Sequence, residues 1–178
     1  MIETERLRLR DWRAEDAEPF CRHLNTPAVM RWLGGVKPRD YYDWLIGERL
    51  MGWQEARGFT LWAVERREDA ALLGFCGLKI SDEPGSLVNG EIEIAWRLRE
   101  DAWGQGFARE AAAASLDYAF ATLEARRVVA LTVPGNVASW GLMERLAMRR
   151  RSDLDFVGAP WAEGTVIVYD LLREAWRA

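Results

Sequence analysis

The residues best suited to chemistry lie between two predicted elements near the middle of the chain. A glycine-rich loop, Gly104-Gln-Gly-Phe-Ala108, follows a predicted strand over 91–98 and precedes a predicted helix that runs to about residue 123. Glycines let the backbone approach a ligand closely, and the first turn of a helix presents unpaired N–H groups and a positive dipole end. Together these features predict a site for an anion such as a phosphate or pyrophosphate.

Two common phosphate-binding motifs do not match this loop. A P-loop needs a lysine and then a serine or threonine after its last glycine, but Phe107 and Ala108 follow Gly106. A dinucleotide-binding loop has a further glycine three residues on and lies early in a βαβ unit. Here Arg109 holds that position, and the loop lies in mid-chain. A nucleotide-binding protein that uses the same loop stays open as one alternative class.

The strand over 91–98 carries carboxylates close to the loop. Its residues alternate between apolar and mostly polar types, which predicts two different faces. One face presents Ile92, Ile94, Trp96 and Leu98, and the other presents Glu91, Glu93, Ala95 and Arg97. The strand, the loop and the helix therefore form one unit in which charged side chains and a predicted anion site are neighbours.

Three blocks of sequence follow one another along the chain. They are Thr4-Glu-Arg-Leu-Arg-Leu-Arg10, the run from Glu93 through Trp103-Gly-Gln-Gly to Ala111, and Val133-Pro-Gly-Asn-Val-Ala-Ser139. In order and spacing they resemble the GNAT superfamily of N-acetyltransferases, in its RimJ/RimL-like branch, over nearly the whole chain. The resemblance implies acetyl-CoA as a co-substrate, an amine as acceptor, direct attack in a ternary complex, and no metal.

The resemblance also implies how coenzyme A would be held. The family motif [QR]-x-x-G-x-[GA] matches at Gly106 and Ala108, whereas Trp103 holds its first position, as is usual in this branch. Backbone amides would surround the diphosphate, and the pantetheine would pair with a strand that diverges from its neighbour beyond a bulge. The implied binding residues are Ala95, Trp96, Arg97, Leu98, Trp103, Gly104, Gln105, Gly106, Phe107, Ala108, Arg109 and Asn136.

Two catalytic residues follow from the same resemblance. A primary amine has a pKa near 10 and must lose a proton before it attacks a thioester. Glu93 matches the family glutamate and is expected to accept that proton, directly or through a water; Glu91 is the second choice. Ser139 is expected to stabilise the leaving sulfur or relay a proton to it, because Met143 stands where many members have a tyrosine acid.

The alternative function is a coenzyme-A-binding regulatory or structural module without turnover, and retention of Glu93 and Ser139 argues against it. The acceptor is expected to be a protein N-terminus or a small amine. Cys76 lies in an apolar strand and is predicted to be a buried, inert thiol rather than an acetyl carrier. Aromatic residues between Trp32 and Trp53, together with Trp161, are expected to lie on the acceptor side.

Composition narrows the class of protein further. The 178 residues carry 24 basic and 28 acidic side chains, a net charge of −4, which argues against a nucleic-acid partner. No apolar run suits a membrane span or a secretory signal. Two isolated cysteines and one histidine offer no zinc motif. We expect one cytoplasmic domain over 1–178, as a monomer or a homodimer.

The hydrophobic patterns show which elements must position these residues. They predict strands over 5–11, 60–65, 72–80, 91–98, 127–133, 148–153 and 165–172, and helices over 14–24, 38–56, 109–123 and 136–147. This order predicts a mixed α/β (α+β) fold. With the resemblance, it implies a GNAT acyl-CoA N-acyltransferase fold, with a central twisted sheet of about seven strands and about four flanking helices.

Overall fold

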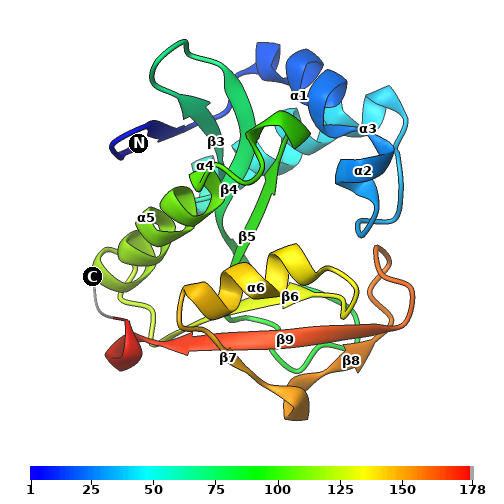
Figure 1. The fold of residues 1–178 in the computed structure, drawn as a ribbon, viewed down its shortest axis with the longest axis vertical. Coiled ribbons are helices and arrows are strands. Elements are labelled where there is room, and N and C mark those ends of the chain that lie inside the picture. Colours follow the sequence, from blue (N-terminus) through cyan, green and yellow to red (C-terminus); the bar gives the residue numbers. More distant parts are fainter. Residues whose placement is uncertain (177–178) are drawn as a thin grey trace.

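The computed structural model describes residues 1–176, and a twisted mixed sheet runs through it (Figure 1). Its strands are β1 (Ile2–Glu3), β2 (Leu7–Arg10), β3 (Leu61–Arg66), β4 (Leu72–Ile80), β5 (Ile92–Leu98), β6 (Arg127–Thr132), β7 (Arg149–Arg150), β8 (Phe156–Val157) and β9 (Thr165–Leu172). The order is β1-β2-β3-β4-β5-β6-β9-β7, with β8 also paired to β9. Only β5 and β6 pair in parallel among these described strands.

The predicted mixed α/β fold is confirmed, with two differences in the strands. The sheet has nine strands rather than about seven. β1 and β8 have two residues each, too few to leave an alternating pattern in the sequence. The predicted strand over 148–153 is reduced to the two residues of β7, because a 3₁₀ turn begins at Ser152.

The helices are α1 (Ala17–Leu24), α2 (Pro27–Met30), α3 (Arg39–Trp44), α4 (Met51–Arg57), α5 (Phe107–Ala121) and α6 (Val137–Arg145). A π-helical stretch, Leu45–Leu50, joins α3 to α4, so the helix expected over 38–56 is one segment of changing pitch. A short helix, α2, starts at Pro27 in the stretch between the two helices predicted over 14–24 and 38–56. The Thr26 hydroxyl accepts the Val29 N–H at 3.2 Å, and Pro27 suits the first helical position.

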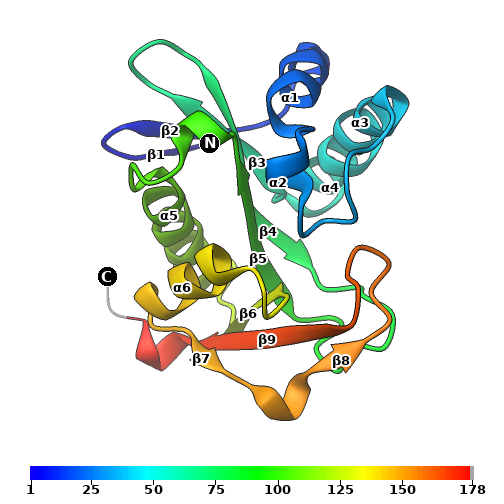
Figure 2. The same ribbon diagram turned by 45° about the vertical axis from the view of Figure 1, so that its right-hand side comes forward.

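Helices cover both faces of the sheet (Figure 2). The larger core lies against α5, whose Ala112, Leu116 and Ala119 are fully buried. On the opposite face, α1 and the segment from α3 to α4 bury Phe20 and Tyr42 against the upper part of the sheet. A third cluster lies on that second face, under β8.

A buried cluster of ion pairs joins β2, which lies in the first sequence block, to the neighbouring strand β3. The guanidinium of Arg10 on β2 bonds Asp16 at 2.8 Å and Glu65 on β3 at 2.7 Å. All three residues are buried. The hydrogen bonds that Arg10 donates to Asp16 are the main cause that raises the pKa of Arg10. Each of the three nitrogens of this buried guanidinium therefore has a hydrogen-bond partner.

The predicted domain over 1–178 includes residues 177 and 178, which lie outside the described residues. Within residues 1–176, no helix has both the length and the apolar character needed to cross a membrane.

Candidate active site

The sheet splits at the parallel pair of β5 and β6. These strands are joined only at Ile92 with Val128 and at Glu93 with Val129. Beyond that point β6 continues along β9, whereas β5 continues along β4. Figure 1 shows β5 rising away from β6 and β9. One edge of β5 is therefore unpaired from residue 94 to residue 98.

The pairing of β5 with β4 decides which main-chain groups face this open edge. The Arg99 N–H donates to the Leu73 carbonyl at 2.8 Å, and the Ser81 N–H donates to the Glu91 carbonyl at 2.9 Å. Because hydrogen-bonded pairs alternate along antiparallel strands, odd-numbered residues of β5 bond to β4. The N–H and carbonyl groups of Ile94, Trp96 and Leu98 consequently point into the split.

The same register places the other expected binding residues of the strand. The main-chain groups of Ala95 and Arg97 face Gly77 and Phe75 on β4, so only their side chains are free to meet a ligand. The register with β4 is continuous over all seven pairs, and the split arises without the expected bulge in that pairing. Trp103 donates its indole N–H to the Leu98 carbonyl at 2.8 Å, at the loop end of the open edge.

The loop after β5 has the backbone of an anion site. Gly104 and Gly106 have φ of +72° and +82°, a region that glycine adopts without strain. Gly106 is the N-cap of α5. Within residues 1–176, no protein group accepts a hydrogen bond from the amides of residues 104–109. These donors lie at the N-terminal end of a helix of 15 residues, whose dipole favours an anion there.

The first sequence block holds this loop in place. Arg6 donates to the Gln105 carbonyl at 2.9 Å, and its guanidinium lies 4.5 Å from the centre of the Phe107 ring. Glu110, in the first turn of α5, accepts from Thr4 Oγ1 at 2.6 Å and from the Arg6 amide at 2.8 Å. Burial raises the pKa of Glu110, but these hydrogen bonds outweigh it and hold that pKa below its ordinary value.

Glu93 is buried at the start of the split, on the face opposite α5. It is 5% exposed, and its Oε2 has no hydrogen-bond partner within residues 1–176. The buried hydroxyl of Ser81, which lies beside it, also lacks one. Burial raises the pKa of Glu93 to about 7, against the opposing charge of Lys79. A carboxylate that titrates near neutrality suits a general base.

Lys79 on β4 and Glu91, which directly precedes β5, make different contacts near Glu93. Lys79 is the cross-strand partner of Glu93, with 3.4 Å between Nζ and Oε2, and it also bonds Asp82 and Glu83 at 3.1 and 3.2 Å. Glu91 is half-buried and bound to Arg127 at 2.6 Å. The sequence did not identify Lys79 or Ser81 as neighbours of Glu93. That requires the register between β4 and β5, which the sequence does not reveal.

Asn136 and Ser139 lie at the start of α6, as expected. The Asn136 side chain caps the helix by accepting the Ser139 N–H at 3.4 Å. The Ser139 hydroxyl is half-buried and makes no hydrogen bond to the described residues. Beside them, Gly135 lies against the Trp32 ring so closely that a side chain there would overlap it.

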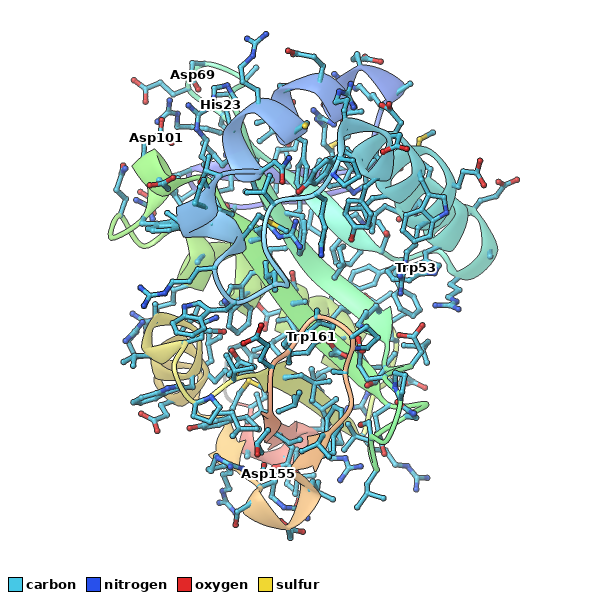
Figure 3. The ribbon with its side chains drawn as sticks, turned by 90° about the vertical axis from the view of Figure 1, so that its right-hand side faces the viewer. His23, Trp53, Asp69, Asp101, Asp155 and Trp161 are labelled. Carbon is cyan, nitrogen blue, oxygen red and sulfur yellow. The ribbon has the colours of Figure 1, made fainter. Side chains whose placement is uncertain are left out.

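Two of the tryptophans expected on the acceptor side lie where the 31–37 segment meets the loops that follow β6 and β8. Trp32, between α2 and α3, packs on Gly135, and the neighbouring Gly34 packs on Trp161 of the β8–β9 loop. Figure 3 shows Trp161 near the middle of the molecule and Trp53 further out, on α4. Tyr42 is a core residue. The 31–37 segment therefore spans the second face of the sheet near the split.

Two hollows flank the first turn of α5. One, of about 350 Å³, lies between α5 and α6 and is lined by Arg109, Arg145 and Trp176 among others. The other, of about 410 Å³, is lined by Arg6 and Arg67 among others. Arg109 is exposed, and Cys76 is fully buried, where burial raises its pKa to about 12. In residues 1–176, no group of three or more His, Cys, Asp or Glu side chains converges as a metal ion requires.

Comparison with known proteins identifies the family. The family model of the Acetyltransferase (GNAT) domain matches residues 6–149. The uncharacterized N-acetyltransferase p20 of Bacillus licheniformis is 30% identical over 181 residues, 97% of this chain and 96% of that protein.

Solved structures share the fold. A GNAT-family acetyltransferase from Bacillus anthracis superposes with a TM-score of 0.80 at 24% identity, over 97% of this chain and 98% of that one. The Ribosomal-protein-S5-alanine Acetyltransferase from Vibrio fischeri has a TM-score of 0.72 at 16% identity, over 99% and 98% of the two chains. Since the family model spans well over half of its length, the chain belongs to the GNAT family and is an acetyltransferase enzyme.

Proposed function

We propose that this enzyme transfers an acetyl group from acetyl-CoA to a primary amine within a ternary complex, and that residues 1–178 form one catalytic domain. The observation that carries the proposal is the position of Glu93. This buried carboxylate stands where β5 and β6 separate, at one end of an open strand edge, and the glycine loop stands at the other. A base and an anion site are thus joined by a strand edge that an extended ligand can follow.

The residues along this path fit coenzyme A. The free amides of residues 104–109 suit its diphosphate. The free N–H and carbonyl groups of Trp96 and the free N–H of Leu98 suit the amides of its pantetheine arm, which would pair with β5 like an added strand. Asn136 lies on the other side of the split, and Arg109 and Arg145 line the adjoining hollow that would take a further phosphate. The side chains of Trp103 and Gln105 hold this loop by donating to the Leu98 and Asp101 carbonyls, and Phe107 anchors it in the core.

The protein groups supply proton transfer and orientation, and acetyl-CoA supplies the activated acetyl thioester. The amine nitrogen bonds to the acetyl carbon as the carbon–sulfur bond breaks. Glu93 takes the proton that the amine loses, directly or through one water held by the Ser81 hydroxyl. The Trp96 N–H, which points into the split, donates to the thioester oxygen and becomes a stronger donor as negative charge develops there.

Ser139 completes the proton balance at the sulfur. Its half-buried hydroxyl is free of protein partners among the described residues and sits one helical turn from Asn136. It stabilises the leaving thiolate and passes a solvent proton to it. A thiol of pKa near 8.5 leaves readily, so this role is secondary to that of Glu93.

We place the enzyme in the RimJ/RimL-like branch. The supporting observation is that Thr4 and Arg6 of the first sequence block bond Glu110 and Gln105 of the coenzyme loop. Trp103 at the first motif position and Ser139 after Asn136 also fit that branch. A fold shared with a ribosomal-protein alanine acetyltransferase is in keeping with this placement. The acceptor is a protein N-terminus or a small amine.

The test combines binding and turnover. Calorimetry with acetyl-CoA should show one site per chain, and a panel of primary amines and peptides should release free thiol with at least one acceptor. The product should carry the acetyl group on nitrogen by mass spectrometry. Binding of coenzyme A without turnover of any amine would instead support a regulatory module, and binding of ATP or NAD but not coenzyme A would contradict the proposed donor.

A further inference from the structure

A second arginine is buried near the site, and its surroundings differ from those of Arg10. Two nitrogens of the Arg97 guanidinium, Nε and Nη1, are buried and have no hydrogen-bond partner within residues 1–176. No carboxylate of those residues lies within 4 Å of it, although Arg10 has two. A buried donor without a partner is rare in proteins, and a buried charge without one is costly.

Aromatic rings hold this guanidinium without neutralising it. Its centre lies 5.1 Å from the ring of Phe75 and 6.0 Å from that of Phe20, and the two rings are stacked. Tyr42 is nearby, but burial raises its pKa to about 12, so the phenol stays neutral and donates to Asn25 at 2.7 Å. Burial lowers the pKa of Arg97, yet a guanidinium remains charged at neutral pH. The charge is therefore present and unmatched.

Arg97 shares a face with Glu93. Side chains alternate along β5, so both project away from α5, on the face of the sheet that α1 and α3 cover. Four residues of strand separate their Cα atoms by about 13 Å. Arg97 as a whole is only partly buried, so its guanidinium lies just beneath the surface of this face. An acceptor bound at both residues would therefore lie along this face of the strand.

We propose that Arg97 is a receptor for an oxyanion of the acceptor, and that the preferred acceptor is an extended small amine that carries a carboxylate or phosphate several bonds from its nitrogen. The inference rests on the proposed function, because it takes Glu93 as the end at which the amine reacts. The oxyanion would accept from two adjacent N–H groups along one edge of the guanidinium, Nε with its neighbour Nη2, and would offset the unmatched charge. A bidentate contact of this kind is among the strongest in proteins.

The test uses paired acceptors and a matched variant. Wild type should acetylate 6-aminohexanoate with a kcat/KM at least tenfold above that for hexylamine. Arg97→Met should reduce this ratio to near one by lowering kcat/KM for 6-aminohexanoate, and Arg97→Lys should keep part of the preference. Arg22→Met, on the exposed surface of α1, is the control and should keep the full ratio. A wild-type preference for hexylamine, or equal losses for both acceptors, would overturn the proposal.

Two further readouts separate this proposal from the proposed function. The expected product, 6-acetamidohexanoate, should raise the melting temperature of wild type but not of Arg97→Met, whether or not any amine is turned over; no shift in wild type, or equal shifts, would contradict the receptor. Without ligand, Arg97→Met should melt at or above the wild-type temperature, because it removes an unpaired buried charge. A purely structural arginine would give a lower melting temperature.

Discussion

Lys79 and Glu93 face each other across β4 and β5, with 3.4 Å between Nζ and Oε2. Both side chains are buried, 9% and 7% exposed. Two opposing effects therefore act on the Glu93 carboxylate: burial disfavours its negative charge, and the Lys79 ammonium group favours that charge. The pKa of Glu93 stands at about 7, raised from an ordinary value of 4.5. Small changes around this pair should change the pH at which the enzyme works.

Replacing Glu93 by glutamine should lower kcat by about 10²–10⁴-fold, the usual contribution of a general base. In wild type, kcat/KM should rise as pH passes through about 7, where Glu93 ionises. Affinity for acetyl-CoA, measured by calorimetry, should stay within twofold. Glu91→Gln is the matched control, because Glu91 is on the same strand but bound to Arg127. Equal turnover in wild type and Glu93→Gln would remove Glu93 as the base.

The same residue should make stability depend on pH. The folded-state pKa of Glu93 is raised, so its protonated form stabilises the fold below about pH 4.5, and this stabilisation is lost as pH rises through about 7. Glutamine carries no charge at any pH. The free energy of unfolding of Glu93→Gln, measured with a denaturant, should therefore rise relative to that of wild type by on the order of 2–3 kcal/mol between pH 5 and pH 8. A difference that does not vary with pH would contradict the raised pKa.

Lys79→Met should shift the acidic limb of the pH–rate profile upward. Without the ammonium group, burial alone acts on Glu93, and its pKa should rise further. Lys79→Arg keeps the positive charge and should keep the limb close to that of wild type. The measurement is kcat/KM from pH 5 to pH 9 for each variant. A limb that stays in place in Lys79→Met would show that this lysine acts only on the loop at Asp82 and Glu83.

Long, patterned elements could be predicted from the sequence. β4 over 72–80 and β9 over 165–172 have the predicted bounds, and Glu93 lies on the predicted face of β5, away from α5. The start of a helix at Asn136 and the burial of Cys76 are also confirmed. Each of these depends on local periodicity or on a single side chain next to its own helix.

Features that depend on distant contacts could not be predicted. The contact of Lys79 with Glu93 requires a strand register, and the split beyond Glu93 requires the switch of β6 to β9. Arg97 reads in the sequence as an ordinary polar residue of an alternating strand, because its aromatic neighbour Phe20 comes from α1, far along the chain. The link between Arg6 and Glu110 is equally distant. Sequence patterns describe each face of an element but not what covers it.

Gly104→Trp should abolish coenzyme binding, and it should destabilise the fold no more than a matched control substitution does. Gly104 has φ of +72° and open space where a side chain would project, in front of the free amides. Gly58, at the end of α4, has φ of +75° and equally open space, so Gly58→Trp is a matched control. Both substitutions should destabilise by about 1–2 kcal/mol. Only Gly104→Trp should lose acetyl-CoA affinity, by at least tenfold; unaltered affinity would contradict the loop assignment.

Ser139→Ala should reduce kcat by less than Glu93→Gln does, by roughly 3–30-fold, because a thiolate of pKa near 8.5 departs with little help. The helix should persist, since the Asn136 side chain holds the amide of residue 139 and not its hydroxyl. Melting temperature checks the fold, and kcat at saturating amine checks the chemistry. If Ser139→Ala proves the more damaging of the two, protonation of the sulfur limits the reaction and the amine loses its proton easily. The buried pair of Lys79 and Glu93 would then control the working pH rather than the rate of the chemical step.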